Sequence, residues 1–413
     1  MSNVRGGAMS IPLAGGTSHN TSMDRPYHCL LIAVLCLVFA AETRADPPRN
    51  PAGESTAAPL ERFRWRPAEG PERDVLGKVL TEAEDGGLLV IGQDGRLWTI
   101  DKPQLAARDS TGETFTPLTS AALGKQLKTE LGAGFDVLTT RHYVICTSAR
   151  RKYAQWCGAL FERLYTSFHN HWKQRGMKLA EPEFPLIALV FASEKEFARF
   201  ATQDAGADAA TAKGYFSIAT NRMVLYDLTA ADASPIGDAD IDKQVAAIPY
   251  NIATIVHEAT HQIAFNSGLH TRFADNPLWL VEGMAMYFET PDLSNKSGWK
   301  TAGAVNTERL GQFRDFLSSG RRRPDSLKTL IMSDARFNDS EQSADAYAEA
   351  WVLSYFLIRT KKEAYVKYLN TLAAKPPLVA DSPEERFAEF RAAFGDDLNQ
   401  LERAMLKSLG KLK

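Results

Sequence analysis

The stretch that decides the fold is Ile252-Ala-Thr-Ile-Val-His257-Glu258-Ala-Thr-His261-Gln-Ile-Ala-Phe265. Its apolar residues recur with a helical period and it contains no Gly or Pro, which predicts a helix that begins after Pro249. Residues four positions apart lie on one face of a helix, so both imidazoles can reach a single metal ion. Glu258 then projects beside them, where its carboxylate can accept a proton from a metal-bound water.

A catalytic zinc site needs a third protein ligand and an open position for water. The next apolar helical segment is Trp279-Leu-Val-Glu282-Gly-Met-Ala-Met-Tyr-Phe-Glu289, and a loop-like stretch separates it from the first. Two antiparallel helices result, which bring Glu282 toward the histidines. The sequence therefore predicts Zn²⁺ held by His257, His261 and Glu282, with Glu258 as the general base.

Two other interpretations of this pattern stay open. In the first, the segment is a buried helix whose histidines hydrogen-bond their neighbours. In the second, the site binds metal without catalysis. Because a general base beside the metal has no use in a pure binding module, Glu258 favours an enzyme.

The N-terminal residues 1–45 are typical of a signal peptide. The apolar run Cys29–Ala41 is followed by Thr43-Arg44-Ala45, a pattern that a signal peptidase cuts before Asp46. The run is shorter than the roughly 20 apolar residues of a membrane span, so we expect no transmembrane domain in the mature form, with an uncleaved anchor as the alternative. Either Met1 or Met23 can be the start. We expect an exported protein, located in the periplasm, at the cell surface or outside the cell.

Three further regions follow the signal. Residues 46–73 are rich in proline and lack periodicity, which indicates a disordered linker. Residues 74–117 contain two short apolar runs around Gln93-Asp94-Gly95, which predicts a hairpin within a small β module. We interpret this module as an accessory or non-catalytic binding domain. Residues 130–410 form the main domain.

The order of expected elements in the main domain predicts an α+β fold, in which a mixed sheet is followed by a helical region. Ser193 is expected to cap a helix, and Ser382-Pro-Glu-Glu385 is a capping box. The expected strands are Phe135–Cys146, Pro185–Phe191 and a pair within 215–228 around Asn221-Arg222. The expected helices are 150–175, 250–266, 277–289, 307–319, 345–360, 362–373 and two more near the end.

The paired helices resemble those of the gluzincin metallopeptidases, and Trp279-Leu-x-Glu-Gly-x-Ala-x-Tyr287 is similar to the corresponding aminopeptidase-N-type segment. Residues from about 135 to 400 also resemble a family of exported bacterial proteins of unassigned function with a gluzincin-like domain. That second resemblance rests on Gly214-Tyr-Phe-Ser, on Asn221-Arg222 with Leu225-Tyr-Asp227, and on His257 through His270.

The resemblance implies further site residues. Aminopeptidase-N-like enzymes stabilise the oxyanion with a tyrosine on a later helix, and Tyr347 lies at a comparable distance past the third ligand, without the Lys-Gly pair that usually follows. Tyr287 and Tyr355 are the other candidates, and core packing explains all three equally well. The strand within 214–227 is expected to pair with extended substrate. Since the Gly-x-Met-Glu-Asn segment of aminopeptidases has no counterpart, an endopeptidase or an unusual substrate is favoured over an aminopeptidase.

The sequence thus predicts a zinc-dependent hydrolase, most directly a peptidase acting on a peptide or protein substrate outside the cytoplasm. An ester or cell-wall amide is an alternative bond, and a non-catalytic metal-binding surface or envelope interaction module is the alternative class. With 48 basic and 50 acidic residues, no charge excess indicates nucleic-acid binding, and the oligomeric state stays open. Arg321–Arg323 is expected to be a solvated loop. Cys146 and Cys157 either form a disulfide or are two buried small hydrophobes.

Overall fold

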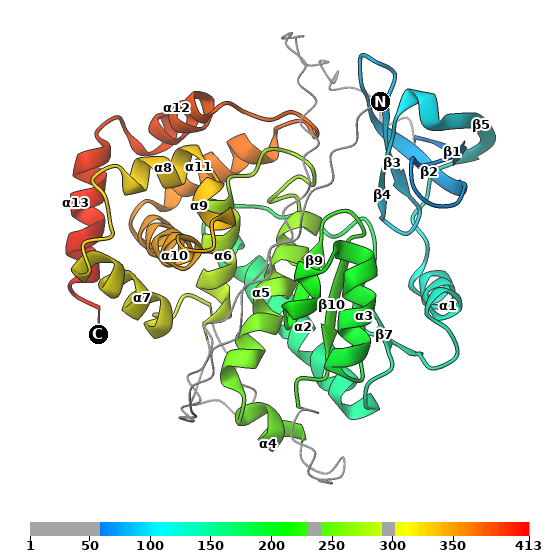
Figure 1. Ribbon diagram of the computed structural model, residues 1–413, viewed down its shortest axis with the longest axis horizontal. Coiled ribbons are helices and arrows are strands. Elements are labelled where there is room, and N and C mark those ends of the chain that lie inside the picture. Colours follow the sequence, from blue (N-terminus) through cyan, green and yellow to red (C-terminus); the bar gives the residue numbers. More distant parts are fainter. Residues whose placement is uncertain (1–57, 230–240, 291–301, 413) are drawn as a thin grey trace, which may run out of the picture.

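The computed structural model describes residues 58–229, 241–290 and 302–412. It has a mixed α+β architecture, as expected, with an N-terminal antiparallel sheet, a second mixed sheet and a helical C-terminal region (Figure 1). The N-terminal sheet and the helical region lie on opposite sides, and helices α5 and α6 lie between them. The predicted signal peptide at 1–45 lies outside the described residues.

The N-terminal β module is a five-stranded antiparallel sheet with the strand order β4-β3-β2-β1-β5. The expected hairpin is confirmed, because β3 and β4 pair across a turn in which Gly95 has φ 82°. Its strands are β1 Pro59–Trp65, β2 Arg73–Glu82, β3 Leu88–Gly92, β4 Leu97–Ile100 and β5 Leu105–Thr114, with a short 3₁₀ helix at Lys102–Gln104.

The predicted linker at 46–73 is wrong in its second half, because strand β1 lies there. Leu60, Phe63 and Trp65 are buried, while the residues between them are mostly charged. Two consecutive charged residues, Glu61 and Arg62, separate Leu60 from Phe63, which breaks the strict alternation that marks a strand. The period of two was therefore hidden in the sequence.

Two apolar clusters fill the module. The first lies within it and consists of Phe63, Trp65, Leu88, Val90 and Ile100. The second is shared with the main domain, because Phe184 and the partly buried Phe273 pack with the module residues Leu60, Leu89, Ile91, Leu97 and Phe115. The module is thus joined to the rest of the protein by apolar packing.

The second sheet has the order β6-β7-β8-β10-β9, with β7, β8 and β10 parallel and the two edge strands antiparallel to them. Its strands are β6 Asp136–Thr139, β7 Tyr143–Thr147, β8 Leu186–Phe191, β9 Gly214–Ser217 and β10 Arg222–Tyr226. The expected single strand Phe135–Cys146 is wrong, since this segment is the β6–β7 hairpin. Glu162 fixes its turn by accepting hydrogen bonds from Thr140 Oγ1 at 2.6 Å and from the His142 backbone N–H at 2.8 Å.

The helices expected from the periodicity are confirmed, as are the Ser193 cap and the capping box at Ser382. The sequence did not indicate α1, α4, α8 or α9; the last three have seven residues or fewer. The helices of the first half are α1 Ser120–Leu131, α2 Arg151–Lys173, α3 Glu194–Ala205, a 3₁₀ helix at Asp208–Thr211 and α4 Ile241–Ala246. The remaining ones are α5 Pro249–Asn266, α6 Leu278–Glu289, α7 Thr307–Ser318, α8 Ser326–Met332, α9 Ala335–Asn338, α10 Ser343–Thr360, α11 Lys362–Ala373, α12 Pro383–Phe394 and α13 Leu398–Leu409.

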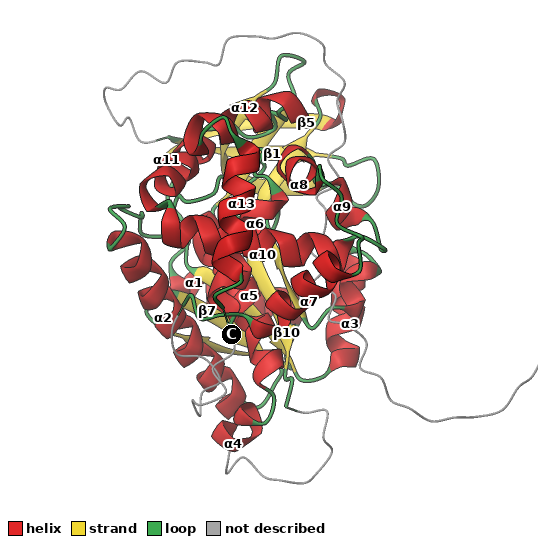
Figure 2. Ribbon diagram, turned by 90° about the vertical axis from the view of Figure 1, so that its left-hand side faces the viewer, coloured by secondary structure: helices red, strands yellow, loops and turns green. Residues whose placement is uncertain are grey.

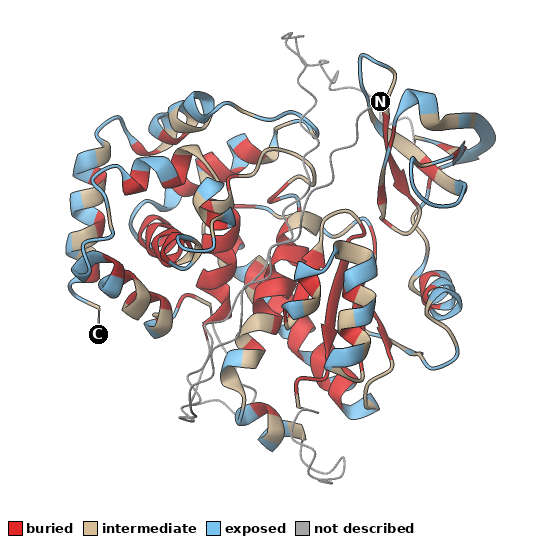
Figure 3. Ribbon diagram, viewed as in Figure 1, coloured by how far each residue is buried: buried red, intermediate tan, exposed pale blue. Residues whose placement is uncertain are grey.

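The core of the main domain is built around α5, α6 and α10, which are buried along most of their length (Figure 3). Viewed from the helical side, the C-terminal helices cover the strands (Figure 2). Helix α6 can approach α10 closely because of Gly283, where an added Cβ would lie 2.1 Å from Ser354 Oγ and 2.6 Å from the Ala350 carbonyl oxygen. Among the described helices, none combines the length and apolar character that crossing a membrane requires.

Two sequence predictions about single side chains, the disulfide alternative and the solvated basic loop, differ from the structure. Cys146 and Cys157 are both free and buried, so the disulfide alternative is wrong. Arg322 also departs from the expected solvated loop, because its side chain is 8% exposed and lies 2.8 Å from the buried carboxylate of Glu349. The basic run therefore includes a buried ion pair.

Candidate metal centre

Helix α5 supplies two of the predicted ligands. Its N-terminus has Pro249 in the first turn, where the missing N–H costs no hydrogen bond. The helix packs against α2 and α6, and against β9 and β10. His257 and His261 are each 1% exposed, and their ring centroids lie 4.6 Å apart.

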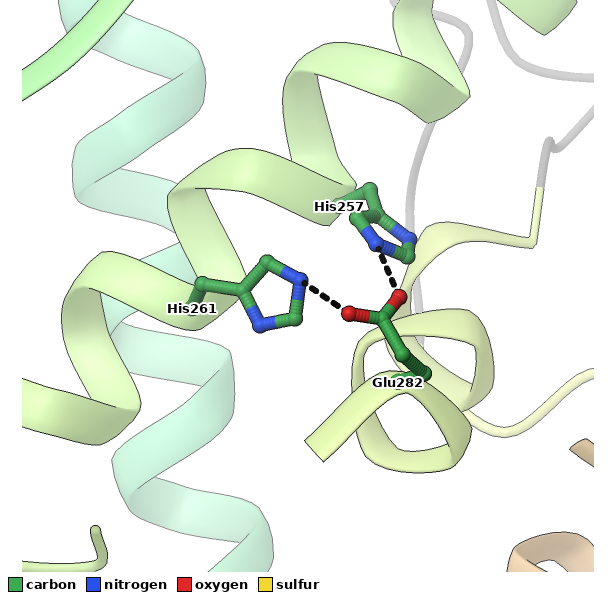
Figure 4. A group of neighbouring side chains, drawn as sticks. All are labelled: His257, His261 and Glu282. Carbon is green, nitrogen blue, oxygen red and sulfur yellow. Dashed lines mark hydrogen bonds and ion pairs between the residues drawn. The ribbon is translucent and has the colours of Figure 1, made fainter. Parts of the chain in front are cut away.

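Helix α6 supplies the third predicted ligand. Its first turn is held by Asp334, whose carboxylate accepts a hydrogen bond of 2.9 Å from the Leu278 backbone N–H. Glu282 follows one turn later and is fully buried. The face of α6 at Gly283 packs against α10, and the neighbouring Glu282 side chain points toward the histidines of α5 (Figure 4).

The three side chains converge between the two helices (Figure 4). His257 Nε2 lies 3.1 Å from Glu282 Oε2, and His261 Nε2 lies 3.6 Å from Glu282 Oε1. One ligand atom from each residue lies within 4.8 Å of the others. Two ligands bound tetrahedrally at about 2.1 Å from one ion are separated by about 3.4 Å. The group can therefore hold a metal ion with little movement.

The hydrogen bonding of the group supports this conclusion. His261 Nε2 and Glu282 Oε1 are buried and have no hydrogen-bond partner among the described residues. Burial of such groups without a partner costs free energy, so a cation between them would supply the missing interaction. Burial, together with His257 and His270, lowers the pKa of His261 well below its usual value. Its imidazole is therefore neutral and available as a ligand.

Glu258 lies beside the ligands but contacts a strand. Its Oε2 accepts a hydrogen bond of 2.9 Å from the backbone N–H of Phe216 in β9. The side chain is buried, and desolvation raises its pKa to about 8, with a further contribution from the charge on Glu282. A bound cation would oppose this effect by favouring the carboxylate form.

A second carboxylate, Glu289, orients the first ligand. Its Oε2 lies 2.5 Å from His257 Nδ1, and its Oε1 accepts a hydrogen bond of 3.1 Å from Asn306 Nδ2. Burial alone would raise the pKa of Glu289, but His257, Arg309 and Asn306 lower it overall. An ionised carboxylate only accepts hydrogen bonds, so it keeps the proton on Nδ1 of His257, and a bound metal ion would replace the 3.1 Å contact between Nε2 and Glu282 Oε2.

Glu289 was not assigned from the sequence, although its segment was. The available signal was its position on α6, two helical turns after Glu282 and therefore on the same face. Asn306 and Arg309 follow after residues 291–301, which lie outside the described residues, and no sequence pattern pointed to them. The N–H of Phe216 is a backbone group, so residue type carried no information about it.

Tyr347, the predicted oxyanion donor, lies on α10 and is half-buried. Its ring packs edge-on against Phe337 and lies 5.8 Å from the guanidinium carbon of Arg309. Arg309 Nε is also 3.9 Å from Glu289 Oε1, so Tyr347 is connected to the surroundings of His257. Its role in catalysis stays a prediction.

The alternative tyrosines lie in a different group. Tyr287 and Tyr355 pack on each other with ring centroids 6.1 Å apart, and Tyr287 also contacts His171 of α2. Five residues along a helix correspond to a rotation of about 140°. Tyr287 therefore lies well away from the face of α6 that carries Glu282.

A protein-family model described as "Protein of unknown function (DUF1570)" matches residues 251–379. The matched stretch includes the three candidate ligands, Glu258, Glu289 and Tyr347. A search of curated proteins found no match. The chain thus carries a domain of unknown function over these residues, in agreement with the expected resemblance to a family of unassigned function.

Proposed function

We propose that this protein is a zinc-dependent peptidase of the gluzincin type. The observation that carries the proposal is the convergence of His257, His261 and Glu282 from two consecutive helices, with Glu258 next to them and outside the ligand set. Two imidazoles and one carboxylate are a ligand set of catalytic zinc sites, which keep one position for water. A purely structural site would have four protein ligands.

When bound, a zinc ion lowers the pKa of a water molecule and polarises the scissile carbonyl. Glu258 would accept a proton from a water molecule held there and would donate it to the leaving amine. Glu289 holds His257 in the tautomer that leaves Nε2 unprotonated. We assign the stabilisation of the oxyanion to Tyr347, whose ring is near Arg309.

The substrate is proposed to be an extended peptide that binds along β9. This strand is at the edge of its sheet, and β10 is its one partner among the strands that the structure describes. The N–H of Phe216 faces away from β10 and toward Glu258, so the unpaired side of β9 adjoins the general base. Extended peptides add to such edges through main-chain hydrogen bonds. Binding along a strand edge requires no free terminus, which favours an endopeptidase.

The experiment compares the parent protein with Glu258→Gln and with Glu194→Gln, an exposed glutamate on α3 that serves as the matched control. Metal content is measured by mass spectrometry, and cleavage is measured on a mixed peptide library. We expect zinc in all three proteins and cleavage by the parent and the control only. Zinc without cleavage by any of them would favour the non-catalytic interaction module, and cleavage of esters or cell-wall amides alone would change the assigned bond.

A further inference from the structure

The turn between β9 and β10, residues 218–221, contacts both helix α5 and the N-terminal β module. At its end, Asn221 adopts φ 60°, a left-handed conformation that few residues other than glycine adopt readily, and is fully buried. A strained conformation at a buried position is kept only where surrounding contacts over-determine it. Those contacts lead in two directions.

The first set of contacts reaches helix α5. The side-chain amides of Asn221 and Asn266 form two reciprocal hydrogen bonds of 2.8 and 2.7 Å. Gln262, which directly follows the ligand His261, donates to the Asn221 carbonyl at 3.0 Å and to the Ile187 carbonyl at 2.8 Å. The turn is therefore fixed to the same helix that carries both histidines.

The second set of contacts reaches the module. The Leu97 backbone N–H in β4 donates to the Ala219 carbonyl at 2.7 Å. Arg272 Nη1 donates both to the Gly95 carbonyl of the module at 2.8 Å and to the Ile218 carbonyl of the turn at 3.2 Å. One guanidinium thus joins the two parts of the chain.

The turn also determines where β9 lies. This strand is short and has one neighbour in its sheet, so its own pairing gives it limited stability. Its Phe216 N–H is the group that holds Glu258. A shift of the turn would therefore move both the donor to Glu258 and the helix that carries the histidines.

We propose that the N-terminal β module braces the metal centre, with Asn221 and Arg272 as positioning residues, instead of acting as a separate binding domain. The inference rests on the metal site proposed above. Without the hydrogen bonds at 218–221, the turn that ends β9 is no longer bonded to the module, and α5 loses the bonds that Gln262 and Asn266 make to Asn221. Loss of a group that hydrogen-bonds a ligand directly lowers metal affinity by about 10- to 100-fold in other metal sites; Asn221 and Arg272 lie one contact further from the ligands, so we expect the lower limit of this range.

The test uses the full chain and four single variants. Asn221→Gly keeps the left-handed conformation but removes the amide pair, and Arg272→Met removes the bridge between the two carbonyls. Thr220→Val is the control in the same turn, since its buried hydroxyl has no hydrogen-bond partner within the described part of the chain. Arg62→Met is the control within the module, because Arg62 pairs with Asp74 of the same sheet at 3.1 Å on the protein surface.

Zinc affinity is measured by chelator competition, and the ligand geometry is measured from the visible absorption spectrum of the cobalt-substituted proteins. We expect Asn221→Gly and Arg272→Met to weaken zinc binding by about ten-fold and to change the cobalt spectrum. Both control variants are expected to match the parent. Cobalt absorption reports ligand geometry directly, so a general loss of stability would not reproduce its change.

The outcomes separate the two proposals. If the parent binds neither zinc nor cobalt, the proposed metal site fails. If the parent binds both ions and Asn221→Gly and Arg272→Met match it in affinity and spectrum, the brace is refuted. Should Asn221→Gly fail to fold, Arg272→Met decides the question, because it alters one half-buried side chain.

Discussion

Replacement of Glu289 by glutamine tests the assignment of the metal ligands most directly. The variant keeps the size of the side chain but removes its charge and one acceptor oxygen. If the new amide nitrogen faces His257 Nδ1, two donors meet and the imidazole must change tautomer, which places a proton on the ligand nitrogen. If it faces Asn306, that residue must rotate and give up its bond to the Arg309 backbone N–H. Either arrangement weakens the support of His257.

The magnitude follows from the hydrogen bond that is lost. The 2.5 Å contact between His257 and Glu289 is buried and involves a carboxylate, and such bonds contribute about 1.5–3 kcal/mol. Since about 1.4 kcal/mol corresponds to ten-fold in affinity, zinc should bind about 10- to 100-fold more weakly to Glu289→Gln. Chelator competition measures this value, and Glu194→Gln again serves as the control. A dissociation constant unchanged from the parent would refute the assigned role of Glu289.

Three further predictions concern stability and reactivity. The pKa of Glu258 is raised to about 8 in the folded protein, so folded Glu258 keeps a proton that the unfolded chain loses near pH 4. The metal-free parent should therefore lose stability relative to Glu258→Gln as pH rises from about 5 to about 8. Melting temperatures measured in a chelator across this pH range test the expectation, and parallel pH profiles of the two proteins would contradict it. Gly283→Ala should destabilise the fold by about 1–3 kcal/mol in urea titrations because the added Cβ meets α10. Gly311→Ala should stabilise it by about 0.5–1 kcal/mol, because among the described residues no atom outside the local helix backbone lies within 4 Å of the added Cβ. Burial raises the pKa of the Cys146 thiol to about 11 and raises the pKa of the Cys157 thiol well above its usual value, so both should react with a thiol reagent only after unfolding; rapid labelling of the native protein would be inconsistent with this.

Helix α5 and its candidate ligands were predictable because the four-residue spacing of His257 and His261 is itself the signal for a shared helical face. The histidines and Glu282 lie on apolar helical segments whose period fixes the face on which each ligand lies. The partners of these residues were not predictable in the same way. Phe216 acts through a backbone N–H, and Asn221 acts through a turn conformation, so neither role depends on a recognisable motif.

The errors in the fold have a common physical origin. The sequence predicts a linker across β1 because Glu61 and Arg62 interrupt the alternation of buried residues, whereas pairing with β2 and β5 fixes the strand in the structure. The segment 135–146 was read as one strand because the hydrogen bonds that stop it come from Glu162 on α2. Both features depend on tertiary contacts, which local patterns do not contain.

The burial of the ligands has a consequence for how an ion would enter and leave. His257, His261 and Glu282 are each at most 1% exposed, so exchange with solution requires a transient opening of the packing around α5 and α6. The residence time of the ion would then be set by the frequency of that opening, independently of the equilibrium affinity. A slow release measured at high chelator concentration would therefore report the dynamics of these two helices.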